Sequence, residues 1–254
     1  MITFFIFMLI LGLLIIVHEF GHFIVAKKLG VKVEKFSFGF GKRILSKKKD
    51  GTEYSISLIP LGGYVKLAGD SLEEFKNNPD EYLSKKPFER CQIIFFGPLL
   101  NYVLGFLCFW LIFFVGYPTL TTKVGGLVDG FGAKSAGIQI GDKIIAIDGK
   151  KVDFWEDLQM AIQDKKAAAK VALSVLRDNK EYTIDVRIKE KRLDDALGQK
   201  RSVGLIGITP NGEIIKVKHG LLESFILGIT KTLDLTVLTY KALWRMITGK
   251  LSMR

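Results

Sequence analysis

The sequence predicts a multi-pass α-helical membrane protein with a cytoplasmic, membrane-associated β-hairpin region and an extracytoplasmic α+β domain. Two apolar runs, at 2–26 and 91–117, are each long enough to cross a hydrocarbon core about 30 Å thick. Nine lysines and arginines fall within 27–50, directly after the first run, and no charged residue precedes that run. Because such clusters mark the cytoplasmic side, we expect 27–90 to lie inside and the chain from 118 onward to lie outside.

The net charge of +11 would also suit a nucleic-acid-binding protein. We attribute it to membrane topology, since the basic residues concentrate beside the first apolar run, and we expect no nucleic-acid partner. The first run differs from a cleaved signal peptide, because it lacks a preceding charged segment and exceeds the usual apolar length. Cys91 and Cys108 lie in or beside the second run and show no spacing typical of a metal site or a disulfide.

The first segment, 1–26, is expected to be a transmembrane helix that carries the sequence HEFGH at 18–22. His18 and His22 are four residues apart, so a helix places them on one face, where two imidazoles can bind one zinc ion (Zn2+). Glu19 flanks them and can take a proton from a water molecule that the metal activates. The alternative is a polar patch that joins helices. Ionisable side chains inside a span are functional by default, which favours a zinc protease site with Glu19 as the catalytic base.

The second segment, 27–90, contains two stretches with the alternation of a β-strand. Tyr54, Ile56 and Leu58 alternate with serines, and phenylalanines alternate upstream in FSFGFG at 36–41. Gly62 and Gly63 are expected to form a turn. The pattern leaves two placements open: a β-hairpin that enters the bilayer, or a small sheet packed on its cytoplasmic face.

The third segment, 91–117, is expected to be the second transmembrane helix. Asn101 is an amide inside this span. It can contact a substrate or the metal-binding helix, or it can form an interhelical hydrogen bond, and both roles stay open. Gly97 and Pro98 are expected to shape the beginning of the helix rather than to take part in chemistry.

The fourth segment, 118–210, has the pattern of a compact α+β domain. Strands are expected at KVGGLV, KIIAID, KVALSVL and EYTIDVRI, and helices at GAKSAG and FWEDLQMAIQ. The phrase SAGIQIGDKIIAIDGKKV, with its short helix and tight DG turn, resembles a PDZ domain of bacterial membrane and periplasmic proteases. Such a domain binds a peptide as an added strand, although the sequence does not indicate where the groove lies.

The last segment, 220–249, is expected to be an amphipathic extracytoplasmic helix rather than a third span. At 100° per residue its charged residues fall within about 80° of arc, opposite an apolar face. It can lie on the outer membrane surface or dock on the preceding domain. The charged residues are Glu223, Lys231, Asp234, Lys241 and Arg245.

Taken in order, HEFGH, a loop ending IPLGGYVK, a second span beginning GPLLNYVLGF and a PDZ domain resemble the site-2 protease family (M50), in its bacterial RseP-type branch. The resemblance covers essentially the whole chain. It implies an intramembrane zinc metalloendopeptidase of the bacterial inner membrane, with the PDZ domain on the periplasmic side. It also implies single-span membrane proteins as substrates, such as anti-sigma factors or remnant signal peptides, cleaved in regulated intramembrane proteolysis.

The resemblance further implies residues that meet the substrate. The family's membrane-associated hairpin is thought to hold an unwound substrate segment by strand addition. Phe38, Gly39, Phe40 and Gly41 are the candidates in this sequence, since the two glycines permit close backbone approach. Asn101 corresponds to an asparagine that lies near the active site in the family, so it joins them as a candidate.

The sequence departs from the family at the third zinc ligand. The family supplies an aspartate from an L-D-G motif on a later helix, and no such motif occurs in these 254 residues. His219 is the one remaining histidine, and its place before the last helix makes it a poor third ligand. We therefore expect a C-terminally truncated chain that binds zinc weakly and is inactive by itself. The alternative function is a membrane-tethered PDZ module that binds peptides without catalysis.

Overall fold

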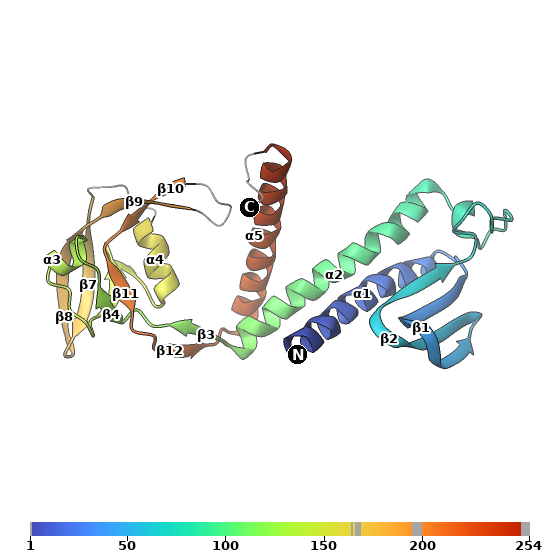
Figure 1. The fold of residues 1–254 in the computed structure, drawn as a ribbon, viewed down its shortest axis with the longest axis horizontal. Helices are drawn as coiled ribbons and strands as arrows, with labels where there is room; N and C mark the ends of the chain where they lie inside the picture. Colours follow the sequence, from blue (N-terminus) through green and yellow to red (C-terminus); the bar gives the residue numbers. More distant parts are fainter. Residues whose placement is uncertain (1, 164, 166–168, 195–199, 250–254) are drawn as a thin grey trace. The chain divides into compact units, whose positions relative to one another are not determined.

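The computed structural model describes residues 2–163, 165, 169–194 and 200–249 (Figure 1). The chain divides into two compact units, Met1–Cys108 and Phe109–Arg254. The first unit contains a long helix, a β-hairpin and most of a second long helix. The second contains a β-rich domain and a C-terminal helix.

Two helices are long and apolar enough to cross a membrane, α1 (Ile2–Lys28) and α2 (Pro87–Val115). They match the predicted runs, except that α2 begins at residue 87 instead of 91. Pro87 favours this beginning because its fixed φ suits the first helical position. Glu89 adds half of a capping box, since its carboxylate accepts the Lys86 amide at 2.8 Å. The helix ends before Gly116, whose φ of +102° no ordinary residue adopts readily.

The region between these helices is a hairpin of β1 (Val33–Lys49) and β2 (Thr52–Leu67). Asp50 and Gly51 form the turn with φ of 48° and 76°, the left-handed pair that a two-residue hairpin turn needs. The hairpin folds over on itself, so that Phe36 of β1 pairs with both Tyr54 and Val65 of β2. The end of β2 thereby packs beside α1 (Figure 1).

The predicted turn at Gly62 and Gly63 is wrong, because both glycines lie inside β2 and Gly63 pairs with Phe38. A Cβ on Gly62 would lie 2.8 Å from the Cδ1 atom of Ile15 on α1. These glycines therefore allow the strand to approach its neighbours closely. The turn is instead made by the Asp-Gly pair at 50–51, which is the stronger hairpin signal.

A small buried cluster joins the hairpin to both helices. Around it, the Glu81 carboxylate holds the loop after β2 by accepting the amides of Lys76 at 2.8 Å and Asn78 at 3.2 Å. This packing fixes the hairpin against the ends of α1 and α2 that lie near it. The cluster consists of Val25, Ala26, Val31, Val33, Leu67 and Ile93.

The second unit contains a four-stranded sheet in the order β6-β5-β7-β8 and, among the described residues, three two-stranded pairings. The sheet strands are β5 (Lys143–Ile147), β6 (Lys150–Lys151), β7 (Lys170–Arg177) and β8 (Lys180–Arg187). The pairings join β3 (Tyr117–Leu120) to β12 (Ile214–Val217), β4 (Val124–Leu127) to β11 (Ile208–Pro210), and β9 (Lys189–Asp194) to β10 (Lys200–Leu205). The short helices are α3 (Gly132–Ser135) and α4 (Trp155–Gln163).

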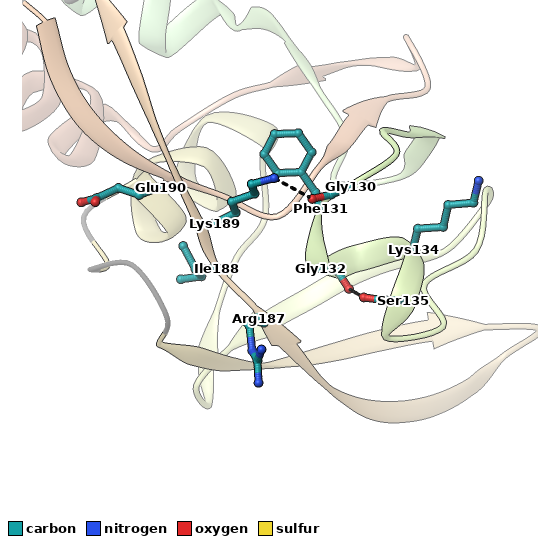
Figure 2. A pocket seen from close by; sticks show the side chains of 9 residues that line it. All are labelled: Gly130, Phe131, Gly132, Lys134, Ser135, Arg187, Ile188, Lys189 and Glu190. Carbon is teal, nitrogen blue, oxygen red and sulfur yellow. Dashed lines mark hydrogen bonds between the residues drawn. The ribbon is translucent and has the colours of Figure 1, made fainter.

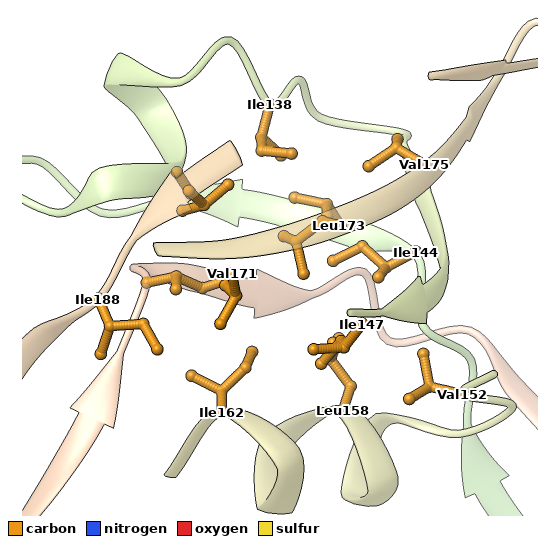
Figure 3. Close-up of a cluster of buried hydrophobic side chains, with 14 residues drawn as sticks. Ile138, Ile144, Ile147, Val152, Leu158, Ile162, Val171, Leu173, Val175 and Ile188 are labelled. Carbon is orange, nitrogen blue, oxygen red and sulfur yellow. The ribbon is translucent and has the colours of Figure 1, made fainter. Parts of the chain in front are cut away.

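The core of this domain lies between the sheet and α4 (Figure 3). The four predicted strands and both predicted helices are present, and the predicted DG turn occurs at Asp148 and Gly149, where both φ angles are positive. The strands β9, β10, β11 and β12 and the three two-stranded pairings that they form were not predicted. The central contacts of the core involve Ile144, Ile147, Leu158, Ile162, Val171, Leu173 and Val175.

The predicted C-terminal helix is α5 (Leu221–Ile247). Its beginning is tied to the end of α2, since the Trp110 indole donates a hydrogen bond to the Leu221 carbonyl at 3.2 Å. His219 stacks on the Tyr117 ring, and its Nδ1 lies 3.0 Å from the Glu223 carboxylate. His219 therefore has a structural place at this junction. Whether α5 lies on a membrane surface or docks on the domain stays a prediction.

Candidate active site

Helix α1 places His18, Glu19 and His22 in its second half, within the apolar segment. The two imidazoles lie one helical turn apart, with ring centroids 4.7 Å from each other and ring planes at 85°. All three side chains are half-buried. The predicted motif therefore forms a compact polar group on a helix that is otherwise apolar around it.

A backbone carbonyl on α2 orients His22. The Nδ1 atom of His22 lies 2.7 Å from the carbonyl oxygen of Ile93, which is buried. A carbonyl oxygen can only accept a hydrogen bond, so Nδ1 must carry the proton. The neutral ring then has its lone pair on Nε2, which is the state a metal-binding histidine needs.

A backbone amide of the hairpin orients Glu19. The Oε2 atom of Glu19 accepts a hydrogen bond from the Val65 amide at 3.0 Å. Val65 belongs to the part of β2 that runs beside α1. Glu19 is therefore held by β2 while His22 is held by α2, and the carboxylate and the imidazoles occupy neighbouring sides of one helix.

The two helices meet at a pair of glycines. A Cβ on Gly21 of α1 would collide with the Phe96 carbonyl oxygen and would lie 2.9 Å from the Cα of Gly97. Gly97 and Pro98 do not shape the beginning of α2, as the sequence had indicated, because the helix begins a full ten residues earlier at Pro87. Gly97 lies instead at the point of closest approach between the helices.

The four proposed substrate-binding residues of the hairpin lie where β1 bends. Gly39 and Gly41 have φ of 86° and 83°, and a Cβ on Gly39 would lie 2.7 Å from the Ile59 carbonyl oxygen. Phe38 lines an apolar cavity of about 280 Å³ along one face of α1, and Phe40 is exposed and stacks on Tyr64. The structure thus brings Phe38 to α1, whereas a contact of any of the four with substrate stays a prediction.

Asn101 lies on the same face of α2 as Ile93 and Gly97, at intervals of four residues. Its Oδ1 atom is buried and has no hydrogen-bond partner within the described part of the chain. A buried carbonyl without a donor is costly, so this atom is available to a group that the structure does not contain. Substrate contact and interhelical bonding both stay predictions.

The donor set fits a zinc ion in part. One half-buried imidazole has its lone pair fixed on Nε2, a second imidazole lies beside it, and a carboxylate flanks both, which are the groups a catalytic zinc site uses. Within residues 2–163, 165, 169–194 and 200–249, however, no group of three or more His, Cys, Asp or Glu side chains is placed to hold a metal. Of the predicted zinc ligands, the described residues bring together two imidazoles, those of His18 and His22, and their binding of a metal stays a prediction.

A second candidate site is a groove in the β-rich domain that the sequence did not reveal. It has a volume of about 160 Å³ and lies between α4 and the segment 204–210. Trp155, Leu158 and Gln159 line it from the helix. A Cβ on Gly204 would lie 2.6 Å from the Ile162 carbonyl, so glycine is needed for this segment to approach α4. The apolar phrase GLIGI at 204–208 was the available signal.

A wider depression of about 720 Å³ lies between α3 and the end of β8 and carries several cations (Figure 2). Two of these cations, both lysines, already have partners in the domain. Lys134 pairs with Asp129 at 2.5 Å, and Lys189 donates to the Gly130 carbonyl at 3.2 Å while lying over the Phe131 ring. Figure 2 shows the side chains of Lys134, Arg187 and Lys189 pointing in different directions rather than toward one point.

Comparison with known proteins found both a family model and individual relatives that match this chain. A family model described as Peptidase family M50 matches residues 6–254. The Regulator of sigma-E protease RseP of Escherichia coli is 34% identical over 215 residues, and a Campylobacter jejuni protein provisionally named a zinc metalloprotease, Cj1068, is 33% identical over 245 residues. These matches cover 83% and 95% of this chain but 47% and 66% of the two relatives, so the chain spans about half to two thirds of their length.

Solved structures match the β-rich domain more weakly. The PDZ domain of an SdrC-like protein from Listeria innocua is 22% identical and has a TM-score of 0.29, with 37% of this chain and 96% of that chain covered. This TM-score is too low for the similarity to support an assignment of the fold.

Proposed function

Because the chain belongs to peptidase family M50, we propose that its first unit forms the active site of a site-2-type intramembrane zinc endopeptidase. The substrates are transmembrane segments of single-span membrane proteins, of the anti-sigma factor or remnant signal peptide type. The observation that carries the proposal is the arrangement on α1, where Ile93 and Val65 hold His22 and Glu19 through backbone groups. A polar patch that only joined helices would need no fixed tautomer and no flanking carboxylate.

The residues divide the chemistry between them. His18 and His22 would hold zinc, which when bound polarises a carbonyl and lowers the pKa of a water molecule to about 7. Glu19 accepts the proton of the attacking water and returns it to the leaving amine. The Val65 amide holds one carboxylate oxygen of Glu19, Oε2, and the other oxygen, Oε1, would take the proton of the attacking water.

The hairpin and Asn101 are proposed to hold the substrate. A helix in lipid hides its peptide bonds in its own hydrogen bonds and must unwind before attack. The bend of β1 at Phe38–Gly41 lies beside α1 and would receive the unwound segment as a strand. The buried Oδ1 of Asn101, which has no donor among the described residues, supports a role in orienting that segment.

We assign the β-rich domain the role of a PDZ peptide-binding module on the periplasmic side of the bacterial inner membrane. The groove beside α4 supports this, since its apolar lining suits the side chains of a peptide laid along 204–210. The basic cluster at 27–50 supports the sidedness, because it favours the cytoplasm for the hairpin. The partners are then the lipid bilayer and single-span proteins, in regulated intramembrane proteolysis.

The decisive experiment replaces Glu19 by Gln. The complete product of the coding sequence that contains these residues is purified in detergent and incubated with a fluorescent single-span substrate. We expect Glu19→Gln to retain zinc while cleavage falls by about 10²–10⁴-fold, the usual size of a general-base effect. Glu34→Gln is the control, since Glu34 is exposed on β1, and its cleavage rate should be unchanged.

Two results would count against the proposal. Cleavage that survives in Glu19→Gln would exclude Glu19 as the base. A wild-type protein that binds peptides in the groove beside α4 but neither holds zinc nor cleaves would support the alternative, a membrane-tethered PDZ module without catalysis.

A further inference from the structure

One face of α2 lies directly against the two imidazoles. Ile93 and Gly97 are four residues apart, so they share this face, and both are buried. Ile93 contributes its carbonyl oxygen to His22. Gly97 lies one turn further on and has no side chain on this face.

Gly97 leaves the space that the His22 ring occupies. A Cβ at this position would lie 2.5 Å from the Nε2 atom of His22 and 3.0 Å from the Cε1 atom of His18. It would also collide with the Cε1 atom of His22. Real Cβ atoms do not approach other atoms to 2.5 Å, so any residue except glycine requires something to move.

The ring cannot move freely. Its Nδ1 is tied to the Ile93 carbonyl at 2.7 Å, so a displaced ring loses that hydrogen bond and the tautomer it fixes. The helices also resist small adjustments, because Gly21 brings the backbones of α1 and α2 into contact at the same level. Displacement of the ring and separation of the helices would therefore each disturb the hydrogen bond that orients Nε2 of His22.

We propose that Gly97 is a positioning residue for the metal-binding histidines: it leaves room for the His22 ring to bond Ile93 through Nδ1 and to present Nε2 as a ligand. The inference rests on the proposed metal-binding role of His18 and His22. Gly97 acts through the imidazoles, whereas a glycine that only allowed helix packing would leave the tautomer of His22 unchanged.

The test compares Gly97→Ala with Gly105→Ala in the full chain. Gly105 lies two turns further along α2, and a Cβ there would meet no atom within 4 Å, so the control makes the same change in helix propensity without the contact. The first readout is the imidazole nitrogen NMR spectrum of the metal-free protein, which reports which nitrogen of His22 carries the proton. The second is zinc affinity by equilibrium dialysis.

We expect wild type and Gly105→Ala to show His22 protonated at Nδ1, and Gly97→Ala to lose this single tautomer. Zinc affinity should fall by about 10–100-fold in Gly97→Ala, the usual effect of disturbing a group that orients a metal ligand. An unchanged spectrum and an unchanged affinity in Gly97→Ala would overturn the inference. If wild type itself binds no zinc, the proposed metal site fails, and the spectra still decide the role of Gly97.

A double variant covers the case in which Gly97→Ala does not fold. In Gly97→Ala/His22→Ala the ring that the new methyl group would meet is absent, so folding should recover to the level of His22→Ala. Failure to recover would show that the methyl group is opposed by a group other than the His22 ring, and the role of Gly97 in positioning that ring would be refuted.

Discussion

The β-rich domain is predicted to depend on one buried charge, that of Asp142. Its side chain is 1% exposed and accepts hydrogen bonds from Nε and one terminal nitrogen of Arg177, both at 2.7 Å. It also accepts the Gln139 amide at 2.8 Å. Asp142 lies just before β5 and Arg177 ends β7, so this pair ties the turn after α3 to the central sheet.

The loss of unfolding free energy in Asp142→Asn can be estimated from this geometry. Breaking a buried pair by removing one partner costs about 3–5 kcal/mol. The Arg177 side chain is 23% exposed to solvent and keeps its hydrogen bond to the Gly137 carbonyl. We therefore expect Asp142→Asn to lower the free energy of unfolding by about 3 kcal/mol, the lower end of this range. That equals roughly a hundredfold change in the opening equilibrium. For a domain of about 100 residues the melting temperature should fall by about 12–24 °C.

The assay is hydrogen exchange of the β5 and β7 amides in the full chain, which measures opening of this domain alone. Asp153→Asn is the control, because its pair with Lys151 at 2.6 Å is solvent-exposed on both sides. Exposed pairs contribute about 0–1 kcal/mol, so exchange in Asp153→Asn should change less than tenfold. Equal exchange rates in the two variants would refute the assignment of Asp142 as a buried structural charge.

Acid should remove the stabilisation that the ionised Asp142 carboxylate gives the β-rich domain. Burial alone would raise the pKa of Asp142, but the Arg177 guanidinium and the Gln139 amide outweigh it and hold the pKa below its ordinary value. The unfolded chain therefore binds the proton more readily than the folded one. The stabilisation is fully present above the unfolded pKa of about 3.9 and is lost as pH falls through the lower folded pKa. Wild-type β7 exchange should accelerate below about pH 4, and Asp142→Asn should show less of this dependence.

Three further predictions concern the helix contact, the hairpin and the groove. Gly21→Ala should lower the melting temperature of the first unit in detergent by several degrees, since its methyl group meets the α2 backbone, while Gly105→Ala should not. Leu45→Trp, at an exposed position of β1, should be quenched by brominated lipids if the hairpin enters the bilayer; absence of quenching would favour the sheet on the cytoplasmic face. Gln159→Trp should fill the groove beside α4 and weaken peptide binding about tenfold or more. Met160→Trp is the control, because Met160 is exposed, and equal peptide affinities of the two variants would exclude this groove as the peptide-binding site.

Local patterns in the sequence predicted the elements that depend on neighbouring residues. The helix that carries His18, Glu19 and His22 follows from an apolar run and four-residue spacing. The strands β5 and β7 follow from short runs rich in apolar residues, and the end of β5 follows from the DG turn after it. These signals act over one or two turns of chain, so a single sequence contains them in full.

The features that the sequence did not predict depend on contacts between residues that are distant in the chain. Val65 and Ile93 lie 46 and 71 residues from the side chains they hold, and they act through backbone groups that any residue type supplies. No residue pattern could have indicated them. Gly62 was assigned to a turn for a related reason, because a glycine in a turn and a glycine under a neighbouring helix are identical in sequence.

The same two backbone contacts explain why an apolar helix can contain these polar side chains. An unpartnered polar group in lipid costs several kcal/mol, and a second polar side chain supplied as a partner would carry its own cost. Backbone groups avoid this, because β2 offers an edge amide at Val65 and α2 offers the carbonyl of Ile93 without adding a side chain. Each contact satisfies one atom only, Oε2 of Glu19 and Nδ1 of His22, which leaves Nε2 of His22 with its lone pair. The arrangement thus reduces the cost of burial while keeping the atom that a metal would need.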